Sequence, residues 1–168
     1  VWNTKDLVRS KGGTAVQAKT GHAFVKQVMR KSDAVYGGEM SAHHYFRDFA
    51  YCDSGMIPWL VSCELMGRSG KPMSALLAER MAAYPSSGET NFTLQDPQSS
   101  IAAVLGHYEP LSLHKDETDG MSLEFDNWRF NLRASNTEPV VRLNVESSGD
   151  PDLVAIKLAE IKTLLNSA

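Results

Sequence analysis

The chain has 168 residues, enough for one medium-sized domain or two small ones, and its 42% hydrophobic and 22% charged residues are ordinary for a folded globular protein. The formal net charge of -3 argues against a basic face for nucleic acid. Two cysteines outside any C-x-x-C pair, and no long apolar run, favour a cytoplasmic protein with no membrane partner.

The start of the chain is predicted to be helical up to Lys11, with Leu7 and Val8 as apolar anchors. The two glycines that follow supply the left-handed backbone that ends many helices. Because the chain starts with Val1 inside this predicted helix, we expect it to be a piece of a longer protein.

The next segment is predicted to form a strand, a helix and a second strand. The strands are 14–19 and 34–36, and the helix covers 23–31, where apolar residues repeat at helical spacing. This order is typical of a β-α-β unit and predicts a parallel sheet. Two further helices are predicted, at 56–65 and 73–84.

Residues 85–88, with the sequence PSSG, break this pattern and mark a predicted domain boundary. We therefore predict an α/β domain at 1–84, truncated at its amino-terminal side, and an α+β domain at 85–168. Short turns join the strands of the second domain, which predicts an antiparallel sheet accompanied by two helices. Its predicted elements are, in chain order, 90–94, 97–107 (helix), 121–125, 128–134, 140–146 and 153–165 (helix).

Residues 37–43, with the sequence GGEMSAH, follow a predicted strand and form the first candidate binding site. Loops at the carboxyl ends of parallel strands bind ligands in α/β sheets, and paired glycines let the backbone approach a ligand closely. In an extended loop Glu39, Ser41 and His43 point to one side, and a carboxylate, a hydroxyl and an imidazole suit the vicinal hydroxyls of a sugar. A glycine-rich turn with a helix-capping serine fits the same residues equally well.

Residues 133–139, with the sequence RASNTEP, form the second candidate site. Arginine offers a planar fork of donors to phosphate oxygens, and the amides of such a turn can surround an anion. The alternation along 128–133 turns Arg133 away from the predicted core, and Arg142 follows on the next strand. On composition alone, a hairpin turn flanked by solvated arginines is the more common arrangement.

Residues 19–22, with the sequence KTGH, form a third candidate, because free amides at the start of a helix favour anions. A polar helix cap is the alternative interpretation of His22. The His43-His44 pair suggests a metal, but no carboxylate or cysteine at ligand spacing completes a site, so no metal site is predicted.

Taken together, the three motifs resemble those of the α-D-phosphohexomutase superfamily, and within it the bacterial phosphomannomutases. Residues 38–43 match the family's sugar-binding loop G-E-M-S-G-H, with Ala42 in place of its second glycine. Residues 133–139 match the phosphate-binding loop R-x-S-N-T-x-P, and residues 19–22 match a segment that lines the cleft. The resemblance covers essentially the whole chain and implies domains 3 and 4 of the family's four, the fourth with a fold like the TATA-binding-protein sheet.

The resemblance also implies a role for each matched residue. Glu39 and Ser41 are expected to contact sugar hydroxyls, while the phosphate loop holds the phosphate that is not reacting. The substrate-binding residues implied are Lys19, His22, Glu39, Ser41 and His43. The phosphate-binding residues implied are Arg133, Ser135, Asn136, Thr137 and Arg142.

As a parent enzyme the resemblance implies a phosphomannomutase of GDP-mannose biosynthesis. Such an isomerase interconverts mannose 6-phosphate and mannose 1-phosphate through a phosphoserine and a 1,6-bisphosphate intermediate. The family's serine loop and Asp-rich Mg²⁺ loop do not occur in this sequence, so both are expected in upstream domains of the same polypeptide. The chain alone is therefore expected to be inactive. A phosphoglucomutase, a dual-specificity mutase and a stand-alone sugar-phosphate binding module are the alternatives.

Overall fold

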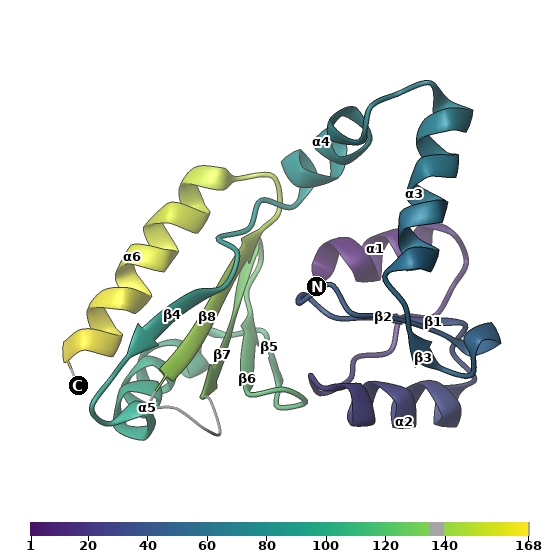
Figure 1. Ribbon diagram of the computed structural model, residues 1–168. Coiled ribbons are helices and arrows are strands. Elements are labelled where there is room, and N and C mark those ends of the chain that lie inside the picture. Colours follow the sequence, from purple (N-terminus) through teal and green to yellow (C-terminus); the bar gives the residue numbers. More distant parts are fainter. Residues whose placement is uncertain (135–139, 168) are drawn as a thin grey trace. The chain divides into compact units, whose positions relative to one another are not determined.

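The computed structural model describes residues 1–134 and 140–167, and Figure 1 labels its helices and strands. Contacts divide the chain into two compact units. The larger unit joins Val1–Ala15 to Glu79–Ala168, and the smaller unit is Val16–Ala78. The predicted division into two domains stays a prediction.

A five-stranded antiparallel sheet organises the larger unit, in the order β4-β8-β7-β6-β5. In its two long central strands Leu132 lies opposite Leu143, and Phe130 lies opposite Val145. This confirms the antiparallel α+β fold expected for the second half, to which the structure adds β5. The strands are β4 (Thr90–Thr93), β5 (His114–Asp116), β6 (Met121–Glu124), β7 (Trp128–Ala134) and β8 (Val140–Ser147).

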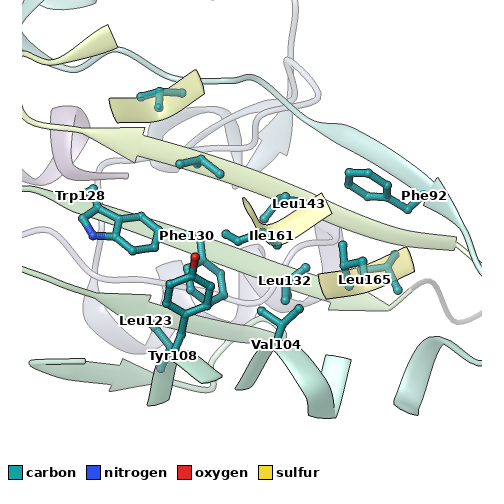
Figure 2. Close-up of a cluster of buried hydrophobic side chains, with 13 residues drawn as sticks. Phe92, Val104, Tyr108, Leu123, Trp128, Phe130, Leu132, Leu143, Ile161 and Leu165 are labelled. Atoms are coloured by element: carbon teal, nitrogen blue, oxygen red, sulfur yellow. The ribbon is translucent and has the colours of Figure 1, made fainter. Parts of the chain in front are cut away.

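Two helices, α5 (Pro97–Tyr108) and α6 (Pro151–Ser167), pack on one face of this sheet (Figure 1). The carboxylate of Asp96 caps α5 by accepting hydrogen bonds from the amides of Gln98 and Ser99, both at 3.1 Å. Thirteen buried side chains fill the space between helices and sheet, and they form the main core of the unit (Figure 2). They are Phe92, Val104, Tyr108, Leu123, Trp128, Phe130, Leu132, Val141, Leu143, Val145, Val154, Ile161 and Leu165.

The start of helix α1 (Trp2–Ser10) lies against the opposite face of the sheet. The main-chain amide of Trp2 donates to Glu146 of β8 at 3.1 Å. Arg129 on the same face is only 3% exposed, and its guanidinium reaches Glu146 at 3.5 Å. The start of α1 therefore contacts this sheet through Glu146 of β8.

The smaller unit contains a three-stranded antiparallel sheet, in the order β1-β2-β3. Its core is three buried side chains, Val25, Met29 and Tyr45. Neither of its two later helices has a buried residue. The elements are α2 (His22–Ser32), β1 (Tyr36–Gly38), β2 (His44–Phe46), a 3-10 helix (Arg47–Phe49), β3 (Cys52–Asp53), α3 (Met56–Ser69) and the first part of α4 (Met73–Ala83).

Two predictions for the smaller unit are wrong. Residues 14–19 have no regular secondary structure and pair with no strand of the described residues, and the exposure of Val16 leaves their alternation without a buried face. The sheet is antiparallel, because β1 pairs with β2 across the short segment 39–43. Such a segment suffices for a hairpin, whereas a parallel crossover needs a dozen residues or more. The helices predicted in this half are confirmed.

Candidate functional site

The GGEMSAH segment ends β1 and turns back into β2 as a tight hairpin. The amide of Glu39 donates to the carbonyl of His43 at 2.9 Å, and the amide of Ala42 donates to the carbonyl of Glu39 at 3.1 Å. Ala42 has φ 64°, in the left-handed region that favours glycine. Ser41 is exposed at the tip. The prediction of an extended loop with alternating side chains is therefore wrong, because the backbone folds back on itself.

Both carboxylate oxygens of Glu39 accept hydrogen bonds. Oε1 accepts from the Tyr45 hydroxyl at 2.5 Å, and Oε2 accepts from the amide of Gly21 at 3.0 Å. Burial, together with the adjacent Glu39 carboxylate, raises the pKa of the Tyr45 phenol, which keeps it a donor. Gly21 belongs to the KTGH turn, so this hydrogen bond joins the turn to the hairpin.

His43 is held by a carboxylate from the neighbouring strand. Its Nδ1 lies 2.6 Å from Oδ2 of Asp53, and Oδ1 of the same carboxylate accepts from the amide of His44 at 2.9 Å. The hydrogen bond to Asp53 raises the pKa of His43, and the same bond lowers the pKa of Asp53. Asp53 therefore fixes the ring by Nδ1 and leaves Nε2 as the nitrogen for another partner.

The KTGH turn also carries Lys19 and His22, two of the candidate substrate-binding residues. The Lys19 ammonium lies 5.1 Å from the centre of the Phe24 ring, a cation–π distance. His22 opens α2 and is exposed. Both therefore lie within two residues of Gly21, whose amide binds Glu39.

The two candidate phosphate-binding arginines are neighbours in the larger unit. Arg133 of β7 lies directly opposite Arg142 of β8, on the sheet face away from the main core. Glu89 joins them: its carboxylate oxygens lie 3.6 Å from Nη2 of Arg133 and 3.4 Å from Nη1 of Arg142. Arg133 also lies 3.8 Å from Asp119. An anion that binds here has to compete with Glu89 for the same donors.

The remaining members of the phosphate loop, Ser135, Asn136 and Thr137, lie outside the described residues. Their roles stay predictions. Within the described residues, Nε of Arg142 is buried and has no hydrogen-bond partner.

The sequence interpretation missed three residues that contact the predicted site. Tyr45 and Asp53 lie on the strands that follow the hairpin, and Glu89 follows the predicted linker. The Asp-Ser-Gly sequence of residues 53–55 is typical of a helix entrance, which hides the role of Asp53 as a partner of His43. A search for acids near each candidate His or Arg would have drawn attention to Asp53 and Glu89, although not to a specific pairing.

Metal and membrane features can be assessed only within the described ranges. There, no three His, Cys, Asp or Glu side chains form a group that could hold a metal ion. In the same ranges no helix is both long enough and apolar enough to cross a bilayer.

Two family models match the sequence in succession. Residues 1–84 match the "alpha/beta/alpha domain III" of phosphoglucomutase/phosphomannomutase, and residues 89–163 match the "C-terminal domain" of the same family. The chain belongs to the phosphoglucomutase/phosphomannomutase family. The fold, two family domains with a five-stranded antiparallel sheet in the second, agrees with this.

Individual relatives within this family are similar to nearly the whole chain. A "Phosphomannomutase" from Salmonella montevideo is 58% identical over 99% of this chain, and one from Escherichia coli (strain K12) is 59% identical over 98%. "Phosphohexose mutases" from Xanthomonas campestris pv. campestris (strain B100) are 54% identical over 98% of the chain.

The chain spans 36% of the length of the first two relatives and 37% of the third. A solved structure from Burkholderia thailandensis, described as a phosphoglucomutase/phosphomannomutase family protein, superposes with a TM-score of 0.77 at 29% identity. That superposition covers 98% of this chain and 35% of the solved one.

Proposed function

We propose that this chain is the sugar- and phosphate-recognition part of a phosphomannomutase, an isomerase that interconverts mannose 6-phosphate and mannose 1-phosphate. The observation that carries the proposal is the hairpin 39–43. Tyr45 and Gly21 hold its Glu39 carboxylate, and Asp53 holds its His43 imidazole. The two adjacent arginines of the larger unit support it, and so does the name "Phosphomannomutase" of the relatives from Salmonella montevideo and Escherichia coli.

Each group has a distinct task in the proposed enzyme. Glu39 and Ser41 bind ring hydroxyls that occupy equivalent places when the sugar turns over in the site. The arginine pair and the turn at 135–137 hold the phosphate that is not reacting. His43, fixed at Nδ1 by Asp53, presents Nε2 to a sugar hydroxyl and takes up its proton when the hydroxyl attacks a phosphoryl group.

Other parts of the reaction need residues that this chain does not supply. The phosphoserine and the Mg²⁺ site of the proposed enzyme belong to upstream domains of the same polypeptide. The described residues do not fit a metal site, so no step proposed here passes through a metal. The proposed setting is GDP-mannose biosynthesis in the cytoplasm. The exposed, unpaired thiols of Cys52 and Cys63 favour a reducing compartment such as the cytoplasm.

A second candidate is a mutase that accepts both mannose and glucose phosphates. The relatives from Xanthomonas campestris carry the broader name "Phosphohexose mutases" at 54% identity, and this observation favours it. Mannose and glucose differ only at the C2 hydroxyl, so a comparison of mannose 1-phosphate with glucose 1-phosphate separates the two candidates.

Titration of the ¹⁵N-labelled chain with mannose 1-phosphate, followed by NMR, tests the proposal. We expect amide shifts in the hairpin 38–43 and near Arg133 and Arg142, with weak, millimolar-range binding because the rest of the cleft is missing. Glucose 1-phosphate is the comparison ligand, and mannose without phosphate is the control for the arginine site. No shift in either region at high ligand concentration contradicts the proposal, and tight binding indicates a stand-alone module.

The coding sequence upstream of Val1 is a second, independent test. We expect it to stay in frame and to encode a serine loop and an Asp-rich metal loop. Upstream sequence that encodes neither would contradict the proposed parent enzyme.

A further inference from the structure

The Glu39 carboxylate is oriented by two donors from different segments of the smaller unit. The Tyr45 hydroxyl of β2 reaches Oε1, and the Gly21 amide, at the start of α2, reaches Oε2. A carboxylate with one donor on each oxygen has its plane as well as its position fixed. Each oxygen keeps a further lone pair, so two ring hydroxyls of a sugar can still bind to it.

Packing fixes the first donor. The Tyr45 side chain is 1% exposed, and its ring packs with Val25 and Met29 of α2 in the core of the unit. Because the ring cannot swing without opening that core, the position of its hydroxyl is set before any ligand arrives. Burial also raises the pKa of the phenol, so the hydroxyl keeps its proton.

Backbone geometry fixes the second donor. Gly21 is the N-cap of α2 and has φ 122°, a conformation that side chains rarely permit. Its amide is held by the start of the helix and points at Glu39 rather than along the chain. The hairpin and the KTGH turn are thus joined through one carboxylate.

We propose that Tyr45 is a positioning residue for sugar binding. Together with the Gly21 amide, its hydroxyl holds the Glu39 carboxylate in one orientation. This inference rests on the proposed function of Glu39 as a ligand of sugar hydroxyls. Without the Tyr45 hydroxyl, Glu39 rotates about its side-chain torsions and loses part of its preorganisation for the sugar.

The variant Tyr45→Phe removes the hydroxyl and keeps the buried ring. Tyr36→Phe is the matched control, because it removes a hydroxyl from the adjacent strand whose partner is Nδ1 of His44, at 2.7 Å, and not Glu39. The first readout needs no ligand: the Gly21 amide resonance of the 168-residue chain. We expect it to move in Tyr45→Phe and in Glu39→Ala, and to stay in place in Tyr36→Phe.

The second readout is the Kd for mannose 1-phosphate, measured by NMR titration of the same variants. Loss of one hydrogen bond that orients a charged group weakens binding, and we expect a Kd roughly five- to tenfold higher for Tyr45→Phe. Tyr36→Phe keeps the wild-type Kd. In the Glu39→Ala background Tyr45→Phe has no further effect, because its partner is already gone.

The outcomes separate the two proposals. If wild type binds and Tyr45→Phe binds equally well, or still weakens binding in the Glu39→Ala background, the positioning role is overturned. If wild type does not bind, the function proposed for Glu39 fails, and the inference about sugar binding fails with it. The Gly21 resonance then still decides whether the Tyr45–Glu39–Gly21 contact exists. If Tyr45→Phe does not fold, an unmoved Gly21 resonance in Glu39→Ala overturns the inference.

Discussion

The two units hold their candidate binding residues in different ways. In the larger unit Arg133 and Arg142 stand on strands whose other face belongs to a core of thirteen buried side chains. In the smaller unit Glu39 and His43 stand on a hairpin backed by a core of only three. In the smaller unit, individual hydrogen bonds hold the side chains of Glu39 and His43 in position, whereas a large packed core supports the strands of the larger unit. We therefore expect single polar substitutions in the smaller unit to move the site residues themselves.

The largest expected effect is on the free energy of unfolding. A pair of leucine substitutions, one in each unit, tests whether packing is stronger in the larger unit. Leu143 is 0% exposed in the core of the larger unit, whereas Leu60 on α3 is 57% exposed. Leu143→Ala should lower the free energy of unfolding by about 3 kcal/mol, because it removes buried methyl groups and leaves a cavity. Leu60→Ala should change it by less than about 0.5 kcal/mol. Urea unfolding followed by circular dichroism measures both.

One outcome of the same experiment would contradict the difference in packing between the two units. Large and equal losses for the two leucines would mean that α3 is buried in solution. The apolar side chains on α3 that share this exposure are Met56, Trp59, Leu60, Val61 and Leu65.

The hairpin itself offers a stabilising substitution. Ala42 has φ 64°, where an alanine side chain is strained and glycine is not. Ala42→Gly should raise the stability of the smaller unit by up to about 1 kcal/mol, the strain of roughly 1–2 kcal/mol being partly offset by the entropy of glycine in the unfolded chain.

Thermal unfolding measures the effect of Ala42→Gly. Ala23→Gly, at an exposed position of α2, is the control. It should lower the stability of the smaller unit by about 1 kcal/mol, because glycine disfavours the helix. If Ala42→Gly destabilises to the same extent, the hairpin does not adopt the left-handed conformation at this position.

The sequence predicted features that depend on local pattern. Alternation placed Trp128, Phe130 and Leu132 on one face of β7, and all three are in the main core, because side chains alternate along any strand. The same alternation placed Arg129 on the other face, but it could not show that Arg129 is buried. The acidic partners of Arg129, Glu124 and Glu146, lie on the two neighbouring strands, which alternation along one strand does not reveal.

Predictions from the sequence were wrong or incomplete where the structure depends on contacts with residues elsewhere in the chain. Residues 14–19 have strand-like composition, but a strand needs a hydrogen-bonded neighbour, and the described part of the chain supplies none. In the candidate site, the motifs indicated Glu39 and His43 as binding residues, and these roles stay predictions. Their supports were not identified, because Tyr45 and Asp53 meet them only after the β1–β2–β3 hairpins have formed.

Charge substitution tests the packed site of the larger unit. Glu89→Gln removes the carboxylate that Arg133 and Arg142 share, so we expect inorganic phosphate to bind about threefold more tightly, and the gain to shrink at high salt. Isothermal titration at two ionic strengths measures it. Glu117→Gln, which makes the same change in net charge beside Lys115, is the matched control. An equal gain in both variants would mean that Glu89 acts only through net charge.

The smallest expected effect concerns the His43–Asp53 pair of the smaller unit. Because the hydrogen bond to Asp53 raises the pKa of His43 and lowers that of Asp53, the pair is charged in the pH range between the two values. Its contribution to stability is complete only within that range. The contribution falls away as the pH rises through the raised pKa of His43, and again as the pH drops through the lowered pKa of Asp53.

Asp53→Asn should therefore return the pKa of His43 toward its ordinary value of about 6.5, with little change in overall stability because both side chains are exposed. NMR titration of the His43 ring measures the shift. Asp48→Asn is the control, since Asp48 pairs with Arg47 in the adjacent 3-10 helix. The Glu39 carboxylate also raises the pKa of His43, so part of the elevation should survive in Asp53→Asn. An unchanged pKa in Asp53→Asn would show that the hairpin, and not the polar contact, sets the state of the imidazole.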